Sequence, residues 1–227
     1  MIVAALAAAL VLGGALPASA DDPPTPVSGA GSDAVNGILD RWRWDAATSS
    51  GLTMNYSGTS SFAGRADFHA GWVDFAVDEL PSAPSIEGNP PESRPHVRVP
   101  AISSGLAFAY HLVVDGTRVS DLRLSSAAIA GIFTGTITAW DDPAIQSANP
   151  DVDLPSTPVV PLLRSDRSAS TLLLTEWLAA EQPAAWSAFT AANGMPEAPA
   201  SVLPVFPGAR GGRGTYGVGL YVAQMYG

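Results

Sequence analysis

Short apolar runs that suit β-strands alternate with helical patterns along this chain of 227 residues. Apolar residues at helical spacing, some of them preceded by Ser or Asp, predict helices over residues 36–44, 125–133, from 142, 170–180 and 184–192. Strand-like runs cover residues 54–56, 72–77 and 158–163, and one or two more strands are expected within 96–113. Residues 81–95 contain five prolines and predict a loop. Because strands and helices alternate without a visible repeat, the sequence predicts an α/β fold.

The composition excludes several classes of chemistry. The chain has no cysteine, and all 11 of its basic residues are arginine. Without cysteine there can be no disulfide scaffold, zinc ribbon, iron–sulfur cluster or thiol catalysis. Without lysine there can be no Schiff base and no Walker phosphate loop. A net charge of −10 argues against nucleic acid as a partner, because such a partner needs a basic surface.

Nothing in the sequence predicts catalysis. The Gly-x-Ser-x-Gly elbow of serine hydrolases is missing. The three histidines, His69, His96 and His111, lack the spacing of metal ligands, and each is expected to be a surface or hydrogen-bonded core residue. We therefore expect a protein that is not an enzyme and that holds neither a metal nor a cofactor.

The first 20 residues predict export. They carry no charge, residues 2–12 form an apolar run, and Ala18-Ser19-Ala20 matches a signal peptidase site. The alternative is a membrane helix, but the run is shorter than the roughly 20 residues that a span needs. A Pro-rich leader, 21–27, follows and is expected to be flexible. We expect a periplasmic, extracellular or cell-envelope protein, and no cysteine is present to carry a lipid anchor.

Three turns rich in small and hydroxyl residues precede apolar segments, at residues 29–33, 57–61 and 164–171. The start of a helix has unpaired N–H groups and a partial positive charge, so each turn is able to hold an anion. Ordinary helix capping is the alternative for each turn taken alone. Arg164 adds a forked cation to the third turn. Asp78 follows a strand-like run and is either a site carboxylate or a turn residue before Pro81.

From about residue 28 to its end, the chain resembles the periplasmic phosphate-binding proteins of Pst-type ABC transporters. Seven motifs carry the resemblance, in the order and at the spacing of that family: 29–32, 55–64, 73–78, 132–145, 148–155, 164–170 and 211–218. Each motif alone is loose, but seven in register are specific.

The resemblance implies a two-lobed α/β fold of the type II periplasmic-binding-protein kind, with the ligand in the cleft between the lobes. Residues 28–104 and 217–227 would form the first lobe, and 105–216 the second. The ligand would be inorganic phosphate or a similar oxyanion, delivered by a monomeric protein to the permease subunits of an ABC transporter for uptake. The family continues beyond the motif at 217–218, so we expect this chain to be a fragment whose first lobe is incomplete.

The resemblance also assigns site residues. The expected phosphate ligands are Asp33, Ala34, Ser61, Asp78, Arg164, Ser168, Ala169 and Ser170. A carboxylate at Asp78 would accept the hydrogen of hydrogen phosphate and repel sulfate, which has no proton to give. We expect Ser61, Arg164 and Ser168 to converge with Asp78 on one cleft, with Arg164 and Asp78 influencing each other's ionisation.

Four residues depart from the family: Ala169 replaces a glycine, Thr215 replaces the asparagine of the glycine-rich loop, and Asp33 and Arg167 bring charges. Asp33 stands where a neutral donor is usual, and a carboxylate about 4 Å from a dianion costs on the order of 4 kcal/mol per charge pair at an effective dielectric constant near 20. Arg167 stands where the family has glycine. Either Arg167 pairs with Asp33 and offsets this repulsion, or Asp33 only caps a helix. The alternative function is a secreted interaction or sensor paralogue that binds another oxyanion or small solute.

Overall fold

The computed structural model describes residues 24–80, 91–200 and 202–224. The predicted signal peptide and the first residues of the leader lie outside the described residues, and Val27 already begins the first strand. Within the described part of the chain, no helix is both long enough and apolar enough to cross a membrane.

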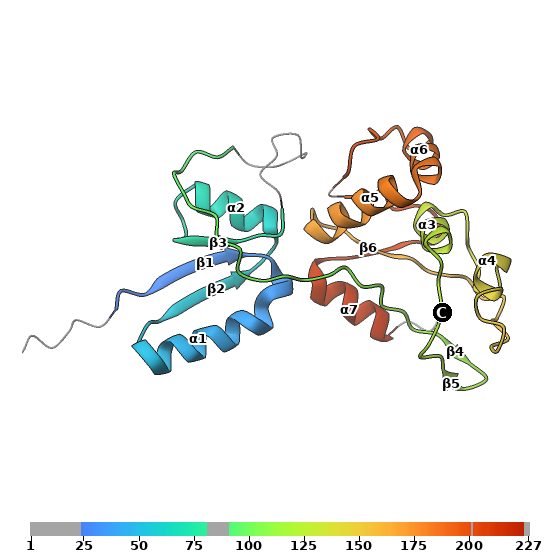
Figure 1. Cartoon of the computed structure of the whole chain (residues 1–227), viewed down its shortest axis with the longest axis horizontal. Coiled ribbons are helices and arrows are strands. Elements are labelled where there is room, and N and C mark those ends of the chain that lie inside the picture. Colours follow the sequence, from blue (N-terminus) through green and yellow to red (C-terminus); the bar gives the residue numbers. More distant parts are fainter. Residues whose placement is uncertain (1–23, 81–90, 201, 225–227) are drawn as a thin grey trace, which may run out of the picture.

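The N-terminal elements form one group around a parallel three-stranded sheet (Figure 1). Strand β1 (Val27–Gly31) lies between β2 (Met54–Gly58) and β3 (Phe75–Val77). Helix α1 (Asn36–Ser50) follows a single 3-10 turn, η1 (Asp33–Val35), and lies against β2, whereas α2 (Ser61–His69) packs against β1 and β3. Parallel strands need crossover connections, which these two helices provide.

The remaining elements form a second group (Figure 1). Its members are β4 (Val113–Val114), β5 (Thr117–Arg118), α3 (Ser126–Thr134), α4 (Pro143–Gln146), β6 (Leu162–Arg164), α5 (Ala169–Glu181), α6 (Pro183–Ala192), β7 (Arg210–Gly212) and α7 (Gly214–Gln224). Strands β4 and β5 form an antiparallel hairpin, and β6 pairs in parallel with β7. Two buried apolar clusters hold this group, one around Trp140 and Ile145 and one around Leu178 and Trp186.

Side-chain caps explain where the helices of the second group begin. Ser125 Oγ accepts a hydrogen bond from Ala128 N at the start of α3, and Asp142 accepts one from Ala144 N at the start of α4. Pro143 occupies the first turn of α4, where its missing N–H costs nothing. The sequence predicted these helix starts, and both are confirmed.

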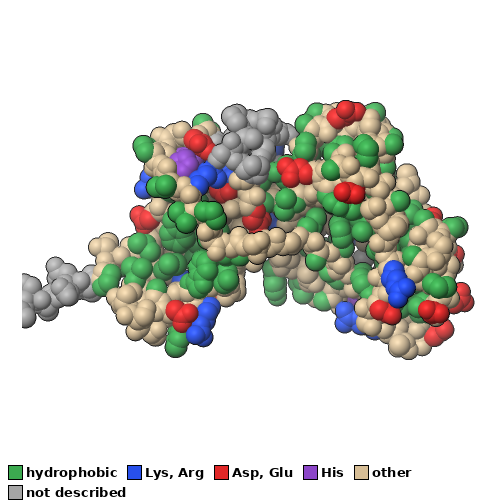
Figure 2. All heavy atoms as spheres, viewed as in Figure 1, with side chains coloured by type: hydrophobic (Ala, Val, Ile, Leu, Met, Phe, Trp, Pro, Cys, Tyr) green, Lys and Arg blue, Asp and Glu red, His purple; other side chains and the backbone are tan. Residues whose placement is uncertain are grey.

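The segment 91–112 contains no helix or strand, so the strands expected within 96–113 are limited to Val113–Val114. Val97 and Val99 are 88% and 78% exposed. An extended run becomes a strand only beside a partner that pairs with its N–H and C=O groups, and the described residues place no strand there. Figure 1 shows this segment linking the two groups, and Figure 2 shows the surface hollowed below it.

The described residues of the two groups touch at an apolar cluster and around the start of α7. Phe62 and Leu80 of the first group share a buried cluster with Ala169 and Leu172 of α5. Helix α7 packs against β6 and β7, and it also contacts η1 of the first group (Figure 1). Thr215 at the start of α7 makes hydrogen bonds with Asp33 of η1, and the assignment of residues 217–227 to the first lobe stays a prediction.

Candidate anion-binding site

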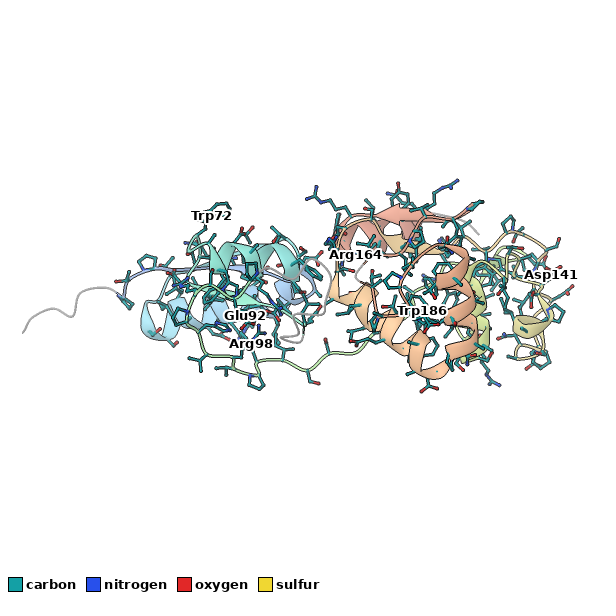
Figure 3. All side chains as sticks on the ribbon, turned by 90° about the horizontal axis from the view of Figure 1, so that it is seen from above. Trp72, Glu92, Arg98, Asp141, Arg164 and Trp186 are labelled. Atoms are coloured by element: carbon teal, nitrogen blue, oxygen red, sulfur yellow. The ribbon has the colours of Figure 1, made fainter. Side chains whose placement is uncertain are left out.

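A small polar cavity lies where the two groups meet. Each group contributes five of the residues that line it: Ser32, Asp33, Ser60, Ser61, Glu79, Arg164, Ser168, Ala169, Ser170 and Thr215. Figure 3 shows Arg164 on the side of the second group that faces the first. The cavity has a volume of about 10 Å³, which is close to the space of a single water molecule.

Strand ends and helix starts bring these residues together. The parallel strands β1, β2 and β3 end at one edge of their sheet, and ligands of α/β sheets bind beyond such carboxyl edges. Ser60 Oγ accepts a hydrogen bond from Ala63 N at the start of α2, and Ser168 Oγ accepts one from Thr171 N at the start of α5. The cavity therefore lies at helix N-termini, whose partial positive charge favours an anion.

Arg164 supplies the positive charge of the cavity, at the end of β6. Its guanidinium donates to both carboxylate oxygens of Asp166, from Nε at 2.9 Å and from Nη2 at 2.5 Å, and its Nη1 donates to Thr215 Oγ1 at 3.3 Å. Burial disfavours the charged guanidinium, but the Asp166 hydrogen bonds and the charges of Asp166, Asp33 and Glu79 outweigh burial and raise the pKa of Arg164. Arg164 is therefore a fixed, permanently charged donor.

Asp33 reaches across from the first group to the start of α7. Its Oδ2 accepts a hydrogen bond from Thr215 N at 2.5 Å, and its Oδ1 accepts one from Thr215 Oγ1 at 3.0 Å. Arg164 Nη1 lies 3.8 Å from Asp33 Oδ1. The expected pair of Asp33 with Arg167 is not among the described contacts of Asp33, whose negative charge faces Arg164 and α7 instead.

Glu79 is a second carboxyl group of the cavity, and sequence reasoning missed it. Burial is the main cause of its raised pKa, and the negative charges of Asp33 and Asp78 raise it further, against a hydrogen bond from Ser32 and the charge of Arg164. The available signal was the Asp78-Glu79 pair directly after β3. Neighbouring residues of an extended chain point to opposite sides, so only one of the two can face a given cavity.

The structure turns Asp78 away from the cavity. Its carboxylate accepts from Arg65 Nη2 at 2.9 Å, from Arg65 Nε at 3.2 Å and from the backbone N–H of Leu80 at 3.1 Å, with Arg98 Nη1 at 3.6 Å. The charges that raise the pKa of Arg164 are those of Asp166, Asp33 and Glu79.

The structure brings most of the other expected site residues together. Those that line the cavity are Asp33, Ser61, Arg164, Ser168, Ala169 and Ser170. Ala34 is not among the lining residues, and its N–H donates to Ser32 Oγ at 3.3 Å, within the cap of η1. Thr215 and Ser60 also line the cavity and were not among the expected ligands.

Tyr56 supports the first-group side of the cavity. Its hydroxyl donates to the carbonyl oxygen of Ser32 at 2.9 Å, and its ring stacks on Phe75. Burial, together with the negative charges of Asp33 and Glu79, raises the pKa of Tyr56, so its hydroxyl keeps its proton and remains a donor. This hydrogen bond fixes the turn that carries Ser32 and Asp33.

A polar cavity at helix starts thus lies between two groups of elements of an α/β fold. The chain matches the family model of the PBP superfamily domain over residues 17–222 and belongs to that superfamily. The predicted α/β class and the resemblance to phosphate-binding proteins are confirmed.

Several curated relatives carry the name phosphate-binding protein. PstS of Xylella fastidiosa is 29% identical over 201 residues, which cover 88% of this chain and 51% of the relative. PstS 2 of Mycobacterium tuberculosis is 35% identical over 141 residues, which cover 60% of this chain and 37% of the relative. PstS3 of Mycobacterium bovis is 33% identical over 139 residues, covering 60% and 36%. The chain thus spans about half the length of the Xylella relative and less of the others.

Replacing Glu79 with glutamine should stabilise the protein at neutral pH and not at acidic pH. The folded-state pKa of Glu79 lies above its ordinary value of 4.5, so the folded protein binds more protons than the unfolded chain between these two pKa values. Stability is therefore lost as the pH rises through the folded-state pKa, and glutamine removes that loss. We expect a gain in unfolding free energy of about 1 kcal/mol or less at pH 7, since the site is partly solvated.

Urea unfolding at pH 4 and at pH 7 measures this difference. Glu181→Gln, at an exposed carboxyl at the end of α5, is the control and should show no such pH-dependent gain. If Glu79→Gln and the wild type had the same free energy of unfolding at both pH values, burial of the Glu79 carboxylate would not destabilise the folded protein, and the prediction would be wrong.

Proposed function

We propose that this chain is a non-catalytic solute-binding protein that holds inorganic phosphate, or a closely similar oxyanion, between two lobes. The first lobe would be built on residues 28–104 and 217–227 and the second on residues 105–216, with the connection between them inside the segment 91–112. The proposal extends to a protein that is exported as a monomer and that delivers its ligand to ABC permease subunits. The names of the PstS relatives support phosphate as the ligand.

The single observation that carries the proposal is the polar cavity that Arg164 lines. Hydroxyl groups of Ser61, Ser168 and Ser170 surround it, and the starts of α2, α5 and α7 adjoin it. Charge-assisted hydrogen bonds from a guanidinium and from hydroxyls are the donors that a dehydrated oxyanion needs. Helix N-termini add oriented N–H groups without a counter-charge.

Glu79 would take the proton-accepting role that the family resemblance assigns to Asp78. A carboxylate in the cavity accepts the hydrogen of hydrogen phosphate or hydrogen arsenate, whereas sulfate at neutral pH has no hydrogen to offer and is repelled. Asp78 would instead support the site, because its pair with Arg65 fixes the end of β3 next to Glu79.

Calorimetric titration with phosphate, arsenate and sulfate tests the proposal. We expect phosphate and arsenate to bind and sulfate to bind at least a hundredfold more weakly. Arg164→Gln should weaken phosphate binding about a hundredfold, because a buried charged donor is lost. Arg118→Gln, on the exposed strand β5, is the matched control and should bind as the wild type does. Failure of phosphate to bind at millimolar concentration, or equal binding of sulfate, would refute the proposal.

A second candidate ligand is an oxyanion with an apolar substituent. An apolar cavity of about 290 Å³ adjoins the anion site and shares Arg164, Ser170 and Thr215 with it, and its walls include Phe108, Phe133, Trp140 and Leu174. This volume is near the lower end of small-molecule pockets. Tighter binding of phenyl phosphate than of inorganic phosphate would favour this candidate, and the reverse order would exclude it.

A further inference from the structure

The Asp33 carboxylate contacts Thr215 at the start of α7, at the polar cavity that both residues line. Asp33 Oδ2 accepts from Thr215 N at 2.5 Å, and Arg164 Nη1 lies 3.8 Å from its other oxygen. Gly214 has a φ of +69°, and a Cβ there would lie only 2.8 Å from Asp33 Oδ2. The carboxylate is thus closely fitted to the first turn of α7, although Asp33 and Thr215 lie 182 residues apart in the chain.

The same groups are the ones that an external oxyanion needs. The N–H groups of the first helical turn have no partner within the helix, and they carry the positive end of the helix dipole. Asp33 uses one of them, the Thr215 hydroxyl and part of the Arg164 charge. The cavity that remains holds about 10 Å³, which suits one water and not a tetrahedral oxyanion with four oxygens.

We propose that the Asp33 carboxylate is an internal anion: it occupies donors of the anion site, joins the first group to α7, and competes with the external oxyanion for Thr215 and Arg164. The proposal rests on the proposed function for the identity of that oxyanion. Ligand entry then requires Asp33 to leave Thr215. The oxyanion therefore binds more weakly than it would if Thr215 and Arg164 were not already in contact with Asp33.

The charges around Asp33 support competition. Asp166 already neutralises Arg164 through two hydrogen bonds, and Glu79 adds a second carboxyl to the cavity. An oxyanion that entered beside a charged Asp33 would face that carboxylate at close range, with Arg164 shared among three acidic groups. Movement of Asp33 away from the site relieves this repulsion, which Coulomb's law makes large at contact distances.

The test is Asp33→Asn, which keeps the shape of the side chain and removes its charge. We expect inorganic phosphate to bind the variant at least tenfold more tightly than the wild type in calorimetric titration. In the ligand-free variant, amide hydrogen exchange at the start of α7 should be at least tenfold faster than in the wild type. Asp40→Asn is the control, since Asp40 is an exposed carboxylate paired with Arg43 on α1, and it should change neither measurement.

The two measurements separate the two proposals. Unchanged exchange at the start of α7 in Asp33→Asn, or weaker phosphate binding by that variant, would overturn the role of Asp33 as an internal anion. Faster exchange at α7 with no phosphate binding by either protein would support the contact between Asp33 and α7 and refute phosphate as the ligand. Faster exchange with tighter phosphate binding supports both.

Discussion

Replacement of Arg65 with methionine is expected to lower the free energy of unfolding by about 3–5 kcal/mol. The Arg65 side chain is 2% exposed, and its guanidinium donates to the Asp78 carboxylate and, at 2.8 Å, to the carbonyl oxygen of Leu80. Methionine retains most of the apolar stem but leaves a largely buried carboxylate without its main partner. Removal of one member of a buried ion pair costs more than the pair contributes, because the remaining charge stays desolvated.

The matched control is Arg41→Met, which removes an exposed arginine paired with Asp45 on α1. Exposed pairs contribute little, so this variant should stay within about 0.5 kcal/mol of the wild type. Urea unfolding followed by tryptophan fluorescence measures both variants. Arg65→Met/Asp78→Asn should recover part of the loss, since the unpaired charge is then gone. Equal stability of Arg65→Met and Arg41→Met would show that the Arg65–Asp78 pair does not hold β3 in place.

Local patterns in the sequence were sufficient to predict α3, α4, α5 and α6 of the second group, but not α7. Capping side chains and apolar periodicity are properties of neighbouring residues, so Ser125 and Asp142 mark the starts of α3 and α4 without knowledge of the rest of the fold. The strands were harder to predict, because a strand needs a partner elsewhere in the chain. Residues 96–109 have strand-like composition and remain irregular, since no described strand lies beside them.

The hydroxyl-rich turns and Arg164 were correctly expected to meet, but the carboxyl groups of the cavity depend on side-chain direction. Asp78 and Glu79 are adjacent, and the family resemblance favoured Asp78. Only the conformation after β3 determines which of them faces the cavity, and the buried Arg65 binds Asp78 on the other side. No local feature of the sequence predicts that Arg65 pairs with Asp78, because α2, which carries Arg65, and the end of β3 meet only in the folded protein.

The partner of Asp33 was beyond sequence reasoning for the same reason. Opposite charges at Asp33 and Arg167 suggested a pair, but Asp33 contacts a backbone N–H and a hydroxyl of Thr215. Backbone donors leave no charge signal in a sequence. In a site built from helix starts, some of the strongest hydrogen-bond donors are therefore backbone N–H groups that a sequence does not reveal. A carboxylate of the same chain, such as that of Asp33, is able to accept from these donors.

The second large effect is expected for Gly64→Ala, because α2 crosses β1 at this glycine. A Cβ at position 64 would lie 2.3 Å from the Cα and 2.4 Å from the N of Gly31, and backbone atoms of a central strand cannot move aside alone. Alanine is the better helix former, so propensity alone predicts stabilisation. We expect the clash to dominate and to cost about 3 kcal/mol, with α2 displaced from the sheet.

That displacement would also disturb the anion site, since Ser60 and Ser61 stand at the start of α2 and line the cavity. Gly37→Ala is the matched control: it lies in α1, a Cβ added there would meet nothing within 4 Å, and it should gain about 0.5–1 kcal/mol from helix propensity. Urea unfolding gives both values, and phosphate titration should show weaker binding by Gly64→Ala and unchanged binding by Gly37→Ala. If both variants were stabilised alike, α2 would not be in close contact with β1. The close approach at Gly64 would then not be what positions the second hydroxyl-rich turn against Arg164.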